Sequence, residues 1–324
     1  MPEHVLVLTL TPSGAGLSDA DREALGAALE YGQRSGLPVA CAVLGHRTAA
    51  AAAEAAESGV NRVLIADSEK FSAFSCDHYV PAASEAVTAA EARVVIVPRG
   101  PDVLEFVPRL AARLDGASVL GVVELRLDSG DVTAVAAAFG GAARAVYRFK
   151  APGPRVLALG PGAGTHPSRE SGRTVATETI TLPETTSRVT VVTPAAADSG
   201  ARLDDARVVV SGGRGLRAGE NYGLVRELAA ALGGMPGASR AIVDEGWAGP
   251  AEQVGLTGRI VVPDLYFAFG ISGASQHLAG MSNSRCIVAV NTDPQAPIFR
   301  YAHYGIVGDC LEILPELVKL SKTN

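Results

Sequence analysis

The first third of the chain alternates continuous apolar runs with segments of helical periodicity. Residues 5–10 (VLVLTL) form a nearly unbroken apolar run, as expected of a strand that is buried on both faces. Ser18, with Asp21 three residues later, matches an acidic variant of the capping box and opens a helix that extends to about Ser35. The same alternation predicts strands at residues 38–45, 63–66 and 92–98 and helices at 48–58, 71–90 and 103–114. A β-α-β-α order of this kind predicts a parallel, doubly wound sheet.

The pattern changes at residue 118. Apolar runs at residues 119–127 and 132–139 flank the turn sequence DSGD, which predicts two strands joined by a tight turn. Further runs without helical periodicity lie at residues 142–149, 156–159, 174–182 and 188–192. We expect these segments to add antiparallel strands to the parallel core, with a loop at residues 160–173. The N-terminal α/β domain would then span residues 1–193.

A segment of small and polar residues separates the two halves of the chain. Residues 194–204 (PAAADSGARLD) carry no hydrophobic pattern and predict an interdomain linker. A second, doubly wound domain is expected over residues 205–324. Its predicted strands lie at residues 208–211, 240–244 and 286–291, and its predicted helices at 220–232 and 309–319. The apolar run at residues 260–269 is interrupted by Pro263 and Asp264, so it predicts two short strands or one bent strand.

Residues 253–281 carry the clearest signal for a ligand. Two glycine-rich turns, at residues 254–258 and 270–274, flank an apolar run, and the second turn leads into a helix at Ser275. Free backbone N–H groups, glycines that admit close approach and a helix N-terminus all favour an anionic group such as a phosphate or pyrophosphate. Other strand ends carry small or polar residues, namely Gly212, Gly213, Ser239, Arg240 and Asn291. The pattern therefore predicts a nucleotide-cofactor site along the carboxyl edge of a parallel sheet.

Composition and charge narrow the class of protein. The 324 residues are enough for two domains, and the use of only 5% aromatic residues beside many Gly, Ala and Val suits α/β layers. The net charge of −6 gives no basic field, so no nucleic-acid partner is expected. Four scattered cysteines without a C-x-x-C pair predict no metal site. Neither a signal segment nor an apolar run of about 20 residues is evident, which predicts a cytoplasmic protein without membrane insertion.

Four segments of the C-terminal half resemble the FAD-binding domain of the electron-transfer flavoprotein alpha subunit. They are VVVSGGRGL (208–216), GASRAIVDEGW (237–247), EQVGLTGRIVVPDLYFAFGISGASQHLAGM (252–281) and SRCIVAVNTDPQAPIFRYAHYGIVGD (284–309). They cover about 100 nearly continuous residues, so the resemblance is far more specific than a single glycine motif. In the N-terminal half the similarity is looser. The family implies one FAD, held mainly by this domain, and a heterodimer with a beta subunit.

The resemblance also implies roles for the matching residues. Thr257 would lie near flavin N5, His277 beside the pyrimidine carbonyl, and Arg240 close to the ring system, where positive charge favours the reduced flavin. Ser239, Ser272 and the amides of Gly273 and Ala274 would serve the pyrophosphate and the ribityl chain. The remaining implied contacts are Arg214, Gln253, Val254, Gly255, Gly258, Gly270, Gln276, Asn291 and Asp309. Asp309 would serve equally well as the N-cap of the last helix.

The sequence departs from the family pattern at three positions in or beside the two glycine-rich turns. Leu256 and Arg259 replace a glutamine and a lysine in the first turn, and Ser275 replaces an isoleucine in the second. Because a glutamine amide is lost beside Thr257, the redox potential and the redox partners do not follow from the resemblance.

Taken together, these expectations describe an electron carrier rather than a substrate-converting enzyme. The resemblance implies transfer from flavin dehydrogenases, such as acyl-CoA dehydrogenases, to a membrane quinone reductase, and no acid–base pair or nucleophile triad is evident. One alternative is a flavin-bifurcating complex, in which a second flavin in the beta chain meets NADH. An NAD-dependent dehydrogenase is less consistent, because the first turn, LTPSGAG at residues 10–16, is not G-x-G-x-x-G. A redox-silent nucleotide-binding module is the third alternative.

Overall fold

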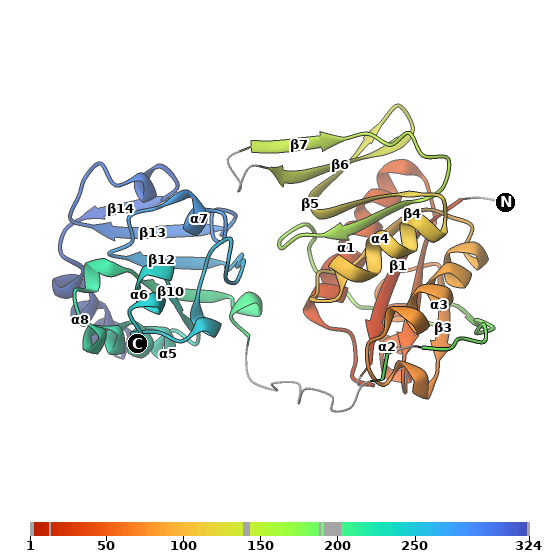
Figure 1. The fold of residues 1–324 in the computed structure, drawn as a ribbon, viewed down its shortest axis with the longest axis horizontal. Helices are drawn as coiled ribbons and strands as arrows, with labels where there is room; N and C mark the ends of the chain where they lie inside the picture. The colour runs from red at the N-terminus through yellow and green to blue at the C-terminus, as the bar shows by residue number, and fades with distance from the viewer. Residues whose placement is uncertain (1–2, 13, 139–142, 188, 191–201, 323–324) are drawn as a thin grey trace. The chain divides into compact units, whose positions relative to one another are not determined.

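The computed structural model describes residues 3–12, 14–138, 143–187, 189–190 and 202–322. These residues form two compact units, one from the N-terminal and one from the C-terminal part of the chain (Figure 1). Each unit has its own sheet and its own core. The predicted α/β class with two sheets is confirmed.

The first unit contains the elements from β1 to β9. Its strands are β1 (His4–Thr11), β2 (Val39–Gly45), β3 (Arg62–Asp67), β4 (Ala92–Val97), β5 (Ala117–Asp128), β6 (Asp131–Ala138), β7 (Ala143–Tyr147), β8 (Arg155–Leu159) and β9 (Ala176–Thr179). Its helices are α1 (Asp19–Ser35), α2 (Ala49–Glu57), α3 (Cys76–Ala89) and α4 (Val103–Arg113), with the 3-10 turn η1 (Glu69–Phe71).

The strands of the first unit lie in the order β7-β6-β5-β8-β4-β1-β2-β3-β9. Alternate residues of β1 belong to two different cores: Val5 and Val7 pack on one face of the sheet and Leu6 and Leu8 on the other. A strand that is covered on both faces needs apolar side chains at every position, which is why its sequence reads as a continuous run.

The N-terminus of α1 has the hydrogen bonds that the sequence predicts. The Asp21 amide donates to the Ser18 hydroxyl at 3.2 Å, and the Asp21 carboxylate accepts from the Ser18 amide at 2.8 Å. Both halves of the predicted capping box are therefore formed. Gly36 ends the helix in the left-handed conformation, with φ of 73°.

The prediction of antiparallel strands added to the parallel core is confirmed for β5 and β6 and wrong for β8 and β9. β5 and β6 pair antiparallel across the predicted turn, but β8 runs parallel to both β4 and β5, and β9 runs parallel to β3. In β8 the residues from Val156 to Leu159 are all buried, as expected of an internal parallel strand. α3 begins at Cys76 rather than at residue 71. Residues 189–190 are not in a strand, and the rest of the predicted strand at 188–192 lies outside the described residues.

The second unit contains the elements from β10 to α8. Its strands are β10 (Val208–Gly212), β11 (Met235–Ala238), β12 (Leu265–Phe269), β13 (Cys286–Asn291) and β14 (Tyr304–Val307). Its helices are α5 (Tyr222–Ala231), α6 (Arg240–Asp244), α7 (Ser275–Leu278) and α8 (Cys310–Ser321). The 3-10 turns are η2 (Leu203–Asp205), η3 (Arg214–Leu216), η4 (Gly219–Asn221), η5 (Pro250–Glu252) and η6 (Pro297–Arg300).

The sheet of the second unit is parallel throughout, in the order β11-β10-β12-β13-β14. The chain moves from β10 outward to β11 and then crosses back to β12, so the winding reverses between β10 and β12. In open α/β sheets a ligand crevice forms outside the carboxyl ends of the strands at such a reversal. The topology therefore gives one position where a ligand site is expected.

The predicted strand at residues 240–244 is wrong, because these residues form the helix α6. Only Ile242 is buried there, while Arg240 and Asp244 pair across one helical turn at 3.4 Å. The strand that joins β10 is β11. Its Pro236 and Gly237 are residue types that are rare inside strands, so the sequence pattern did not predict it. A proline is tolerated because β11 is the edge strand. In the apolar run at residues 260–269, only Leu265–Phe269 is a strand.

Little of the predicted linker can be compared with the structure. Of residues 194–204, only 202–204 are described, and Leu203 is 4% exposed in the core of the second unit. Among the described residues, none of the helices combines the length and the apolarity required to span a bilayer.

Candidate functional site

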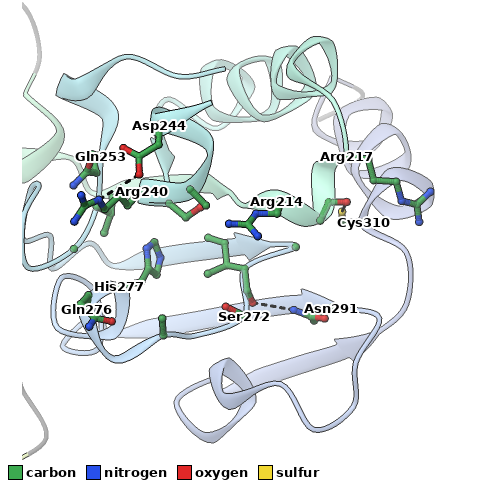
Figure 2. A pocket seen from close by; sticks show the side chains of 18 of the residues that line it. Arg214, Arg217, Arg240, Asp244, Gln253, Ser272, Gln276, His277, Asn291 and Cys310 are labelled. Atoms are coloured by element: carbon green, nitrogen blue, oxygen red, sulfur yellow. Dashed lines mark hydrogen bonds and ion pairs between the residues drawn. The ribbon is translucent and has the colours of Figure 1, made fainter. Parts of the chain in front are cut away.

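A cavity of about 780 Å³ lies at the carboxyl edge of the second sheet (Figure 2). Residues that follow each of the five strands line it: Arg214 after β10, Ser239 after β11, Gly270 after β12, Thr292 after β13 and Gly308 after β14. Its lining includes residues that follow β10 and β12, the two strands between which the winding reverses. The fold therefore places a cavity of ligand size where the topology predicts one.

The cavity brings together most of the residues that the sequence singled out. The lining residues among them are Arg214, Ser239, Arg240, Gln253, Val254, Gly255, Thr257, Gly270, Ser272, Ala274, Gln276, His277, Asn291 and Asp309. Gly258 and Gly273 do not line the cavity. A Cβ at Gly258 would lie 2.3 Å from the Gln253 carbonyl oxygen, and one at Gly273 would lie 2.3 Å from the Ile298 nitrogen. These two glycines let the turns pack closely rather than admit a ligand.

A second pair of glycines allows two loops of the cavity wall to touch. Gly270 has φ of 62°, and a Cβ there would lie 2.6 Å from the Gly215 Cα. The Gly215 amide donates to the Gly270 carbonyl at 3.0 Å. Because neither residue has a side chain, the backbones of the loops after β10 and β12 can pack directly against each other, and both loops line the cavity.

The cavity carries positive charge on three arginines. Arg214 pairs loosely with Glu245 at 3.6 Å, Arg240 with Asp244 at 3.4 Å, and Arg217 closely with Asp309 at 2.5 Å. The side chains of all three are more than half exposed. Exposed, weakly held guanidinium groups can turn toward an anionic ligand at low cost, so Arg214 and Arg240 are suited to bind an anionic group such as phosphate.

Polar side chains hold the turns in place. The Gln253 amide donates to the Thr257 hydroxyl at 3.0 Å, which orients that hydroxyl within the first turn. The Asn291 amide donates to the Ile271 carbonyl at 2.9 Å, and its oxygen accepts from the Asp293 amide at 2.9 Å. Asn291 therefore ties the end of β13 to the end of β12, and its side chain serves the shape of the cavity.

His277 lies on α7, with its ring in the wall of the cavity. The residue is 6% exposed, and burial lowers its pKa to about 4. Its Nε2 lies 2.9 Å from the Tyr266 hydroxyl. Its Nδ1 is buried and, among the described residues, has no partner at full hydrogen-bond geometry.

The helix that follows the second turn begins at Ser275, as predicted, and is short. α7 has four residues, Ser275–Leu278, so it supplies little of the dipole that a longer helix would bring. The Leu256 amide donates to the Gln276 carbonyl at 2.8 Å and so joins the first turn to α7. Anion binding here would rest on the arginines and on loop amides more than on a helix terminus.

Asp309 is the N-cap of α8. Its carboxylate accepts from the Leu311 amide at 3.0 Å and caps α8. This backbone hydrogen bond, together with Arg217, lowers the pKa of the carboxyl group. The residue lines the cavity as well, so the N-cap role and a ligand contact do not exclude each other.

Several lining residues were not singled out from the sequence as ligand contacts. They are Gly215, Arg217, Ala241, Asp244, Leu256, Ile271, Thr292, Gly308 and Cys310. Most stand one or two positions from a predicted residue, so a wider window at each strand end would have included them. Arg217 had no local signal of its own, because it reaches the cavity only through the fold of η3 and α8.

The cavity and its lining fit a dinucleotide. A volume of about 780 Å³ lies in the usual range for cofactor sites. Three arginines line the cavity, Gly215 and Gly270 meet closely in its wall, and the ring of His277 is buried beside it. Fold and site together are those of an α/β protein that binds a nucleotide cofactor.

Comparison with known proteins identifies the family. The FAD-binding domain of electron transfer flavoproteins matches residues 202–282, and the electron transfer flavoprotein domain matches residues 5–185. The alpha subunit from Paracoccus denitrificans is 39% identical over 315 residues, which covers 97% of this chain and 98% of the relative. The alpha subunit from Thermoanaerobacterium thermosaccharolyticum is 35% identical over 301 residues, covering 92% and 91%. The chain belongs to the electron transfer flavoprotein alpha subunit family, and its second unit carries the FAD-binding domain of that family.

Proposed function

We propose that this chain holds FAD in the cavity at the reversal between β10 and β12, as the alpha half of a heterodimer with a beta subunit. In this proposal it accepts electrons in the cytoplasm from flavin dehydrogenases, such as acyl-CoA dehydrogenases, and passes them to a membrane quinone reductase. The observation that supports it best is the convergence of Arg214, Arg240, Thr257 and His277 on one cavity from four separate segments.

The bound flavin would supply the electron chemistry, and the residues of the chain would set its properties. Arg240 would place a positive charge near the ring and favour its reduced, anionic form. Thr257, oriented by Gln253, would offer a fixed hydroxyl. Arg214, Ser239 and Ser272 would bind the pyrophosphate and the ribityl chain. No residue of the chain is assigned a proton-transfer step on a separate substrate.

Cofactor content gives the first test. The chain would be expressed together with the candidate beta subunit from the same source, purified, and its visible spectrum recorded. We expect a yellow complex with one FAD per heterodimer. A heterodimer that stays colourless after FAD is added would refute the proposal and leave the redox-silent alternative.

The source of electrons separates a carrier from a bifurcating complex. A carrier is reduced by a flavin dehydrogenase with its substrate and not by NADH alone, whereas a bifurcating complex is reduced by NADH and contains a second flavin. Rapid flavin reduction by NADH would therefore contradict the carrier assignment.

The placement of the ring can be tested by charge removal. Arg240→Gln removes a cation from the cavity, and we expect it to lower the flavin midpoint potential, with a loss of up to about tenfold in the ratio of reduced to oxidised affinity. Arg207→Gln is the matched control, because Arg207 pairs with Asp264 and does not line the cavity. Equal potentials in the two variants would place the ring elsewhere.

A further inference from the structure

Leu256 is an apolar residue in the wall of the cavity. It lines the cavity, is 54% exposed, and belongs to neither core of the second unit. An apolar side chain outside the core is stabilised when a ligand covers it, because its surface leaves water. Of the parts of FAD, the ring systems offer apolar faces for such a contact, whereas the pyrophosphate and the ribityl chain are polar.

The backbone of the first turn fixes the position of Leu256. The Gly258 amide donates to the Gly255 carbonyl at 3.0 Å, so Leu256 and Thr257 are the two central residues of a tight turn. The Leu256 amide donates to the Gln276 carbonyl at 2.8 Å, which ties the tip of the turn to α7. The Leu256 Cα is therefore held by hydrogen bonds of the turn and of α7, and only the rotamer of its side chain is free.

The contacts of the first turn place Leu256 at one end of the cavity lining. In Figure 2 the side chains labelled at one end are Arg240, Gln253, Gln276 and His277, and those at the other end are Arg217 and Cys310. Leu256 belongs to the first end, because its amide is bonded to Gln276 and the adjacent Thr257 accepts from Gln253 at 3.0 Å. In the proposed function this end holds the flavin ring, because Arg240 and Thr257 belong to it.

An apolar contact at this end opposes the effect of Arg240 on a bound ring. The Leu256 side chain donates no hydrogen bond to negative charge on the ring, and it displaces water that would otherwise solvate that charge. Both effects favour the neutral, oxidised ring over the anionic, reduced ring, whereas the guanidinium of Arg240 favours the reduced ring. The two residues therefore shift the flavin midpoint potential in opposite directions.

We propose that Leu256 contacts the flavin ring and lowers the midpoint potential of the bound flavin relative to a polar side chain at the same position. This inference rests on the proposed function, because it requires the ring at this end of the cavity. A lower potential makes the flavin a weaker electron acceptor. Leu256 thereby limits the class of donors that can reduce the protein.

Potentiometric titration of the heterodimer tests the effect on the flavin. Leu256→Gln adds an amide donor, so we expect a higher midpoint potential, with a rise of up to about tenfold in the ratio of reduced to oxidised FAD affinity, the scale of one hydrogen bond. Leu256→Met retains an apolar side chain of similar volume and should restore the native potential. Ile260→Gln is the matched control, because Ile260 is 41% exposed and does not line the cavity. No rise in Leu256→Gln, or an equal rise in Ile260→Gln, would refute the redox role.

Thiol labelling tests the contact without a redox measurement. Leu256→Cys and Ile260→Cys each place one thiol at an exposed position, and the native heterodimer gives the background labelling of the cysteines already present. The rate of maleimide labelling is measured after FAD is removed and again after it is restored. We expect FAD to slow labelling at position 256 by about tenfold or more and to leave the rate at position 260 unchanged, because a thiol must be accessible to react.

The outcomes separate this inference from the proposed function. If the native heterodimer binds no FAD, the proposed function fails and this inference fails with it. If FAD binds but does not slow labelling at position 256, or if that thiol is unreactive even without FAD, the contact alone is refuted. If FAD slows labelling and Leu256→Gln leaves the potential unchanged, Leu256 contacts a part of FAD other than the flavin ring, and the inference is overturned.

Discussion

At the residue scale, the burial of His277 makes part of the stability depend on pH. Its folded pKa of about 4 lies below the value near 6.5 of an unfolded histidine. The unfolded chain therefore takes up a proton first as the pH falls, so stability is complete above the unfolded pKa and is lost between about pH 6.5 and pH 4. A shift of this size corresponds to roughly 3 kcal/mol over the whole range.

We expect His277→Gln to remove this dependence. Between pH 7.5 and pH 5, the unfolding free energy of the second unit should fall by about 2 kcal/mol more in the native chain than in the variant. Trp247 is the single tryptophan and lies in the second unit, so its fluorescence during urea unfolding reports on that unit alone. Parallel pH profiles for the two proteins would show that His277 is not buried in its neutral form.

At the scale of single elements, the contact between the loops after β10 and β12 depends on glycine. Gly270→Ala adds a methyl group 2.6 Å from the Gly215 Cα and also places a non-glycine residue at φ of 62°. We expect a loss of about 2–4 kcal/mol in unfolding free energy, together with a loss of bound FAD. The expected loss of FAD comes from the contact with Gly215 and not from the positive φ.

Gly233 provides the control for strain. Its φ is 64°, almost the same as that of Gly270, but no atom lies within 4 Å of an added Cβ. Gly233→Ala should therefore cost only about 1 kcal/mol and leave FAD content unchanged. Similar FAD loss in both variants would mean that the contact with Gly215 does not shape the cavity.

For α8, the stabilisation by the Asp309 N-cap hydrogen bond can be measured separately from the effect of the Asp309 charge. We expect Asp309→Ala to cost about 1 kcal/mol in unfolding free energy, because the Leu311 amide loses its acceptor. Asp309→Asn keeps an acceptor oxygen and gives up only the exposed pair with Arg217, so it should be nearly neutral. Urea unfolding followed by Trp247 fluorescence compares the two. An Asn variant as unstable as the Ala variant would assign the stabilisation to the charge instead.

At the scale of the whole molecule, all the residues that line the candidate site belong to the second unit. That unit also has two cores of its own, one on each face of its parallel sheet. We expect a fragment of residues 202–324 to fold cooperatively and to bind FAD in a titration followed by flavin fluorescence. His277→Gln and Gly233→Ala in the fragment would serve as site and control variants. A fragment that folds but binds no FAD would show that the first unit or the beta subunit completes the site.

The sequence predicted most elements of both units because their signals are local. The buried strand β1 and the capping box at Ser18 need only a few neighbouring residues to be recognised. The elements that the sequence did not predict correctly depend on contacts between distant parts of the chain. The edge strand β11 contains a proline and a glycine, and the short apolar helix α6 looks like a strand until its burial is known. The direction of β8 depends on the route of the whole chain back into the sheet.

For the candidate site, the residue types at the strand ends and the resemblance of residues 208–309 were sufficient to predict an FAD domain, and the family comparison agrees. They were sufficient because glycine-rich turns and polar residues at strand ends can be recognised within short segments of the sequence. Only the tertiary structure decided that Gly258 and Gly273 support the turns and that Asn291 ties β12 to β13. The same holds for the burial of His277 against Tyr266, eleven residues away in sequence. Burial, pKa and hydrogen-bond partners arise from atoms that folding brings together from different strands, and no local pattern contains them.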